Sequence, residues 1–214
     1  MSYLRKAGLT AIVFFAIAFG AAAVAHADII IATGNNPQPD ENVLLNTGIT
    51  GNPIFGTTNQ TGLSVRFSSD ENITAPANGQ ARIEAADGTL DQLTIDIPGA
   101  TFTSLILNID AATAGSTSFL VTENNGQTTQ GTFALGASGE NFFTITAING
   151  QRISSVFFTT TVAMTLTNVD DVAQIRIGGA VPTTTSVPEP TTMLLLGTGL
   201  LGGAVQRWRR QRHV

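Results

Sequence analysis

Carboxylates are the side chains between residues 28 and 186 that could carry acid–base chemistry. This stretch contains 14 aspartates and glutamates and 4 arginines, but no histidine, cysteine, lysine, tyrosine or tryptophan. The composition excludes a Ser-His-Asp triad, a Cys-His pair, a Schiff-base lysine and a zinc site built from histidine or cysteine. A glycoside hydrolase needs only two carboxylates flanking a bond, and Glu84, Asp87, Asp91 and Glu123 are candidates. We expect a non-catalytic domain, with a carboxylate-only glycoside hydrolase as an alternative.

Calcium is the one cofactor that these residue types suggest. Aspartate and asparagine oxygens in loops are hard ligands that suit Ca²⁺. The stretches ADGTLDQ and NVDDVAQ offer Asp87, Asp91, Asp170 and Asp171. Neither stretch matches an EF-hand loop, and solvated turn residues account for the same pattern. We therefore predict no resident metal or cofactor, and keep a calcium-dependent, lectin-like carbohydrate-binding module as a second alternative.

Threonines recur as T-x-T units. The units begin at Thr101, Thr144, Thr159 and Thr165. Aligned on neighbouring strands they would form a flat lattice of hydroxyl and methyl groups, as on some ice-binding faces. Threonine is also a favoured strand residue, and the spacing between the units is irregular, so strand propensity is the preferred interpretation.

The charge is distributed unevenly along the chain. Residues 28–186 carry 4 arginines against 14 acidic residues, a formal net charge of −10, although the whole chain sums to −5. The other basic residues lie near the two ends. An acidic body without a basic patch repels phosphate backbones, which argues against a nucleic-acid partner.

Short segments of alternating apolar and polar residues dominate the stretch that would position these side chains. Most are five to nine residues long, rich in β-branched and aromatic residues, and separated by Asn/Gly turn signals. We predict an all-β fold, an antiparallel β-sandwich of jelly-roll-like type, over residues 28–179. The residues from Gly34 to Gly62 are predicted to be long loops with about two edge strands. The predicted strands are 63–67, 92–97, 104–110, 117–123, 129–135, 141–147, 153–161, 163–167 and 173–179.

The first 27 residues have the three parts of a secretory signal peptide. Arg5 and Lys6 precede an uncharged, mainly apolar run, and Ala25 and Ala27 provide the small residues of a signal peptidase site. We predict cleavage after Ala27, and therefore export of the rest of the chain.

The C-terminal end contains three ordered blocks. A spacer over residues 180–186 leads into Val187, Pro188, Glu189 and Pro190, and an uncharged run begins at Thr191. We predict a single transmembrane helix over residues 191–208. Positive charge favours the cytoplasmic side of a membrane, so the β-domain would lie outside. The predicted cytoplasmic stop consists of Arg207, Arg209, Arg210 and Arg212.

This order of motif, apolar segment and terminal arginine cluster over residues 187–214 resembles the PEP-CTERM protein-sorting domain, also called the ice-binding protein C-terminal domain. The resemblance implies recognition by exosortase, a membrane-embedded protease or transpeptidase, with processing near Pro188–Pro190. It also implies a Gram-negative bacterium that secretes exopolysaccharide. The expected protein is anchored transiently or permanently in the inner membrane and then held at, or released to, the cell surface, biofilm or extracellular matrix.

Overall fold

The computed structural model describes residues 28–137, 139–161 and 169–183. The described residues form strands and no helix, and every pairing with a given register is antiparallel. This confirms the predicted all-β, antiparallel class. The predicted signal peptide, the predicted strand 163–167 and the predicted transmembrane helix 191–208 lie outside the described residues. The chain divides into two compact units, residues 1–181 and 182–214, and the strands described below belong to the first, apart from the last residue of the final strand.

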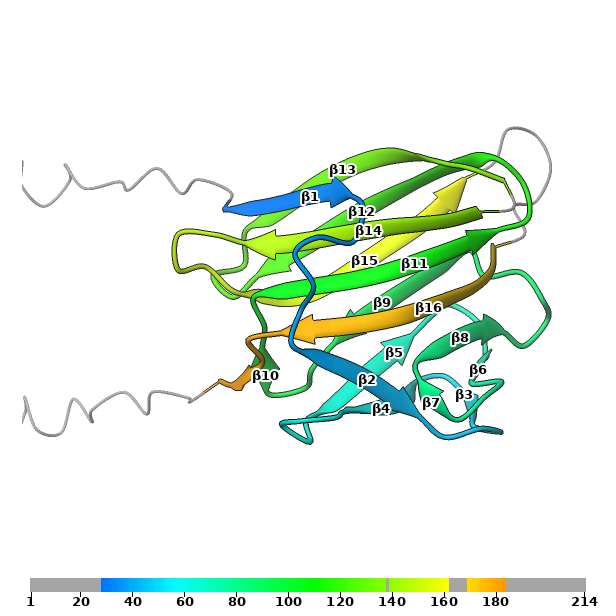
Figure 1. Ribbon diagram of the computed structural model, residues 1–214, viewed down its shortest axis with the longest axis horizontal. Helices are drawn as coiled ribbons and strands as arrows, with labels where there is room; N and C mark the ends of the chain where they lie inside the picture. Colours follow the sequence, from blue (N-terminus) through cyan, green and yellow to red (C-terminus); the bar gives the residue numbers. More distant parts are fainter. Residues whose placement is uncertain (1–27, 138, 162–168, 184–214) are drawn as a thin grey trace, which may run out of the picture. The chain divides into compact units, whose positions relative to one another are not determined.

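One hydrogen-bonded path passes through most strands (Figure 1). Its first part is β1 (Ile29–Thr33), β14 (Gly139–Ala147), β11 (Ser104–Ala111), β16 (Val169–Gly178) and β2 (Glu41–Leu45). It continues through β4 (Ile54–Thr58), β5 (Ser64–Ser68), β9 (Gln92–Asp96), β15 (Ile153–Thr161), β12 (Gly115–Glu123) and β13 (Thr128–Leu135).

Six short strands complete the fold. β8 (Arg82–Ala85) pairs with β16, and β7 (Gly79–Gln80) pairs with β2. β6 (Ile73–Thr74) connects β8 to β3 (Thr50–Gly51), while β10 (Ala100–Thr101) and β17 (Val181–Pro182) form a separate two-stranded sheet.

Phenylalanines join two layers of strands across the core. In Figure 1, β14, β11 and β16 lie in front of β15 and β9. The ring of Phe119 on β12 lies 4.9 Å from that of Phe143 on β14 and 5.7 Å from that of Phe158 on β15, measured between centroids. All three side chains are buried. Offset and tilted ring pairs of this kind add to the free energy gained by apolar burial.

Strand β2 connects the two layers. Its first residues, Glu41 and Asn42, pair with β16, whereas Val43 and Leu44 pair with β4. The prediction of long loops with about two edge strands between Gly34 and Gly62 was therefore wrong, because β2 is central and β3 and β4 also lie in this stretch. The alternation of β2 was missed in the sequence because Glu41 occupies an inward-facing position, where an apolar residue is usually found.

Hydrogen bonds compensate for the burial of Glu41. Burial alone would raise the pKa of this carboxyl, but donors on Thr61 and Gln60 outweigh burial and lower it. The backbone N–H of Thr61 donates to Oε2 over 2.7 Å, and its hydroxyl donates over 2.9 Å. The carboxylate thus ties β2 to the turn between β4 and β5.

The segment between β1 and β2 crosses the outer side of the front layer (Figure 1). The N–H of Gly34 donates to the carbonyl of Phe142, and the Thr144 hydroxyl donates to the Gly34 carbonyl. Arg176 Nη1 donates to Oε1 of Gln38 over 2.9 Å. Ile106 lies on the outer side of β11, between Thr144 and Arg176 in the strand register. Because both neighbours bind the crossing segment, Ile106 is only 1% exposed.

A β-bulge adjusts the register of β16 against β11. The pairing shifts by one residue between Ile106 and Asn108, and Gln174 on the longer side has a φ of 52°. The extra residue allows both Val172 and Ile175 to reach the core, although they are three residues apart.

Candidate functional site

Two acidic loops meet at one end of the described domain. Asp70 and Glu71 follow β5, and Asp87 and Asp91 lie between β8 and β9. We call these four carboxylates the loop cluster. Partial burial, a hydrogen bond to Asp87 and the nearby charges of Asp87, Asp70 and Asp91 raise the pKa of Glu71 from 4.5 to about 7. Desolvation is the largest cause of this rise, followed by the hydrogen bond to Asp87 and by repulsion from the neighbouring carboxylates.

The loop cluster includes two of the four predicted calcium candidates. Asp87 also accepts a hydrogen bond from the backbone N–H of Thr89 over 3.2 Å, which stabilises its turn. The contribution of Asp70 and Glu71 was missed from the sequence, because 16 residues separate Glu71 from Asp87 and only the fold brings them together. Within the described ranges, no three carboxylates or histidines are arranged so that they could hold a metal ion together.

The other two calcium candidates, Asp170 and Asp171, have different environments. Asp170 is exposed, whereas Asp171 is 4% exposed. Arg82 donates to Oδ2 of Asp171 from Nε over 2.9 Å and from Nη2 over 2.7 Å. Burial raises the pKa of Asp171, and the attraction to Arg82 opposes that increase. Asp171 therefore acts as the partner of a guanidinium group in this structure.

Glu84 and Glu123, the remaining hydrolase candidates, lie apart on β8 and β12. Glu84 Oε1 lies 3.3 Å from Nη2 of Arg82. Glu123 is 1% exposed at the end of β12, and its Oε2 accepts a hydrogen bond from Asn125 Nδ2 over 3.2 Å. Its Oε1 has no hydrogen-bond partner within the described residues.

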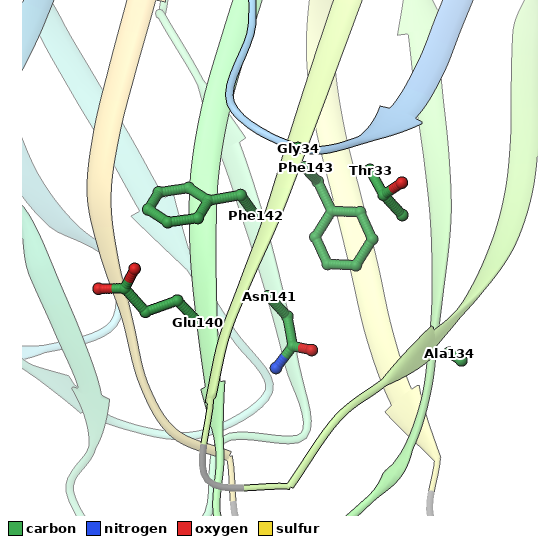
Figure 2. A pocket seen from close by; sticks show the side chains of 7 residues that line it. All are labelled: Thr33, Gly34, Ala134, Glu140, Asn141, Phe142 and Phe143. Carbon is green, nitrogen blue, oxygen red and sulfur yellow. The ribbon is translucent and has the colours of Figure 1, made fainter.

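Figure 2 shows a shallow cavity of about 260 Å³ beside β14. Glu140 and Phe142 point to one side of the strand, and Asn141 and Phe143 point to the other. The other lining residues are Thr33, Gly34 and Ala134. Glu140 is the one carboxylate that lines this cavity, whereas glycoside hydrolysis requires two.

The T-x-T units do not form one array. Thr144 is buried on β14, and Thr101 is buried on β10. Thr159 and Thr161 lie on β15 in the other layer, and the unit that begins at Thr165 lies outside the described residues. The described units therefore lie on three strands, β10, β14 and β15, that do not pair with one another in either sheet.

Comparison with family models identifies the C-terminal end of the chain. Residues 186–210 match the PEP-CTERM protein-sorting motif. The match includes Val187, Pro188, Glu189 and Pro190, and confirms the resemblance found in the sequence. No curated protein matches the chain.

The motif defines a class of protein rather than an activity. Chains that carry it are exported, anchored in the membrane and processed by exosortase, and this chain carries the motif. The structure contains no helix long and apolar enough to span a membrane among residues 28–137, 139–161 and 169–183. The predicted sites at Ala25 and Ala27, in the sorting motif and at Arg207, Arg209, Arg210 and Arg212 lie outside these ranges.

Proposed function

We propose that this protein is a non-catalytic surface or matrix protein that exosortase releases from the inner membrane of an exopolysaccharide-secreting bacterium. Signal peptidase cleaves after Ala27, and residues 191–208 then hold the chain in the membrane with the arginine cluster on the cytoplasmic side. Exosortase processes the chain near Pro188–Pro190. The single observation that carries this proposal is the PEP-CTERM motif at residues 186–210.

The acidic domain that is delivered in this way is proposed to be a jelly-roll-like β-sandwich without enzymatic activity. The packing of β14 against β12 through Phe143 and Phe119 supports two facing sheets. The absence of histidine, cysteine, lysine and tyrosine from residues 28–186 supports a binding or structural role. The exposed domain would then associate with the exopolysaccharide or biofilm.

The mature C-terminus tests the sorting proposal. We expect the intact mass of the protein from cells with exosortase to correspond to a chain that ends near Pro190. In cells that lack exosortase, or after Pro188→Ala with Glu189→Ala, the chain should keep its C-terminal arginines and stay in the membrane fraction. As a matched control, Pro182→Ala lies outside the motif and should leave processing unchanged. An identical mature mass with and without exosortase would contradict the proposal.

A calcium-dependent carbohydrate-binding module is the second candidate function. The observation that favours it is the loop cluster, where burial, a hydrogen bond to Asp87 and the nearby charges of Asp87, Asp70 and Asp91 together raise the pKa of Glu71 to about 7. A divalent cation would relieve this repulsion. A glycan array with and without EDTA tests it, with Asp87→Asn and Asp91→Asn as variants. Glycan binding that is unchanged by EDTA would exclude calcium dependence.

A further inference from the structure

The outward sides of β5, β9, β15, β12 and β13 form a continuous surface, which we call the neutral face. Phe157 lies near its middle, directly between Thr94 of β9 and Leu120 of β12 in the strand register. Because residues alternate along a strand, the neighbours Val156 and Phe158 point into the core and Phe157 points outward. The ring is partly exposed and presents an apolar surface to the outside.

Hydroxyl groups surround this ring on both sides. On one side, Thr159 of β15 pairs with Ser118 of β12, which pairs with Thr132 of β13. On the other side, Ser155 pairs with Thr122 in the same way. Neighbouring positions of this kind are about 5 Å apart, so the hydroxyls form a regular array.

Several of these hydroxyls have unused hydrogen-bonding capacity. Ser118 and Thr132 bind each other over 2.9 Å. The hydroxyls of Thr122, Ser155 and Thr159 make no hydrogen bond with another described residue. Each hydroxyl can donate one hydrogen bond and accept others, so these side chains could bind an external polar ligand.

The neutral face has no net charge, although it belongs to a strongly acidic domain. Its only ionised outward side chains on these five strands are Arg66 and Asp96, which form a bidentate pair with distances of 2.9 and 2.8 Å. The pair neutralises itself, although residues 28–186 carry a formal charge of −10. A polyanion would therefore be repelled by the domain and would find no free cation on this face.

The composition also argues against a protein partner. The centre of a protein–protein interface is enriched in apolar and aromatic residues. Here Phe157 and Leu120 form a small apolar centre, and hydroxyl and amide groups surround it. Uncharged sugar rings match this arrangement, because their C–H faces can stack on Phe157 while their hydroxyls exchange hydrogen bonds with serine and threonine.

We propose that the neutral face binds an uncharged polysaccharide chain. The proposal rests on the proposed function, since it assumes that the domain is exposed to exopolysaccharide. It makes Phe157 the stacking residue, and Thr159 and Thr122 the residues that bind sugar hydroxyls. The acidic loops and the loop cluster take no part, so binding requires no calcium.

Affinity electrophoresis of the full-length chain in detergent tests this proposal. We expect gels that contain dextran or hydroxyethyl cellulose to retard the protein, whereas alginate, an acidic polysaccharide, should not. Phe157→Ala should weaken binding about tenfold. Thr159→Val keeps the shape and strand propensity of the side chain, so it should weaken binding about threefold without changing the melting temperature.

Phe142→Ala is the matched control, because Phe142 also points outward but lies on β14 in the other layer. It should leave retardation unchanged. The proposal is overturned if no neutral polysaccharide retards the protein, if alginate retards it more strongly, or if Phe142→Ala weakens binding as much as Phe157→Ala. It is also overturned if Phe157→Ala instead abolishes self-association. None of these results affects C-terminal processing, so failure here leaves the sorting proposal standing.

Discussion

Single side chains in this domain show how burial and charge decide what a carboxylate does. Asp171 and Glu41 are both buried, but Asp171 has an arginine partner and Glu41 has hydrogen-bond donors from a turn. Glu71 has neither, and partial burial, a hydrogen bond to Asp87 and the nearby carboxylates raise its pKa to about 7. The neighbours of a carboxylate therefore decide whether it binds a turn through hydrogen bonds, forms an ion pair with arginine or keeps its proton beside other carboxylates.

Glu71 gives a pH-dependent prediction. Its pKa is higher in the folded chain than the usual 4.5, so its contribution to stability is complete below about pH 4.5 and is lost as the pH rises through about 7. Glu71→Gln removes this loss. We expect the variant to gain on the order of 1 kcal/mol in unfolding free energy at about pH 8, allowing for solvent screening, and little at about pH 5.

Urea denaturation at both pH values provides the measurement. Asp40→Asn is the control, because it also removes one negative charge from an exposed position outside the loop cluster. Its effect should be small and similar at the two pH values. A gain for Glu71→Gln that is the same at both would show that the proton on Glu71 does not influence folding.

At the scale of one element, β16 depends on a residue with an unfavourable backbone conformation. Gln174 has a φ of 52°, a region that glycine occupies without cost and that other residues occupy at a cost of about 1 kcal/mol. We expect Gln174→Gly to raise the unfolding free energy by about 0.5–1 kcal/mol, measured by urea denaturation. Ala173→Gly, at the neighbouring position without positive φ, should lower it by a similar amount. If both changes destabilise the protein, the bulge is not strained.

The strands themselves were largely predictable from the sequence. Alternation in segments such as QLTIDI and TSFLVTE placed eight strands close to their observed positions, because buried and more exposed residues alternate along most of them. The NGQ turn was also predicted, and Asn149 and Gly150 have φ values of 54° and 80°. The strand ENVLL was missed because Glu41 points inward.

The candidate sites were less predictable, since they depend on pairings between distant segments. Alternation could identify Phe157 and Phe158 as pointing to opposite sides, but not which strands would lie beside them. The side chains that lie next to one another on the neutral face are set by the register of β9, β15, β12 and β13. By contrast, Val187–Pro190 is a contiguous motif and could be found directly.

The whole molecule depends on pairings that join its beginning and its end. β16 pairs with β11, β2 and β8, so removing it would take one hydrogen-bonded neighbour from each of these three strands. We expect a chain that ends at Thr183 to keep its β-sheet circular dichroism and to resist proteolysis. A chain that ends at Thr161 should be unfolded and degraded. Cooperative unfolding of the shorter chain would contradict this dependence.

The position of β2 has a consequence for export. β1 pairs with β14, and β2 pairs with β16, more than a hundred residues later in the chain. β1 and the first two residues of β2 therefore have no partners until almost the entire domain has followed, whereas Val43 and Leu44 can pair with β4 early. Long-range pairing of the first kind is slow. A chain that cannot complete its fold early stays unfolded while it crosses the membrane. The order of the strands along the chain is the cause of this late folding.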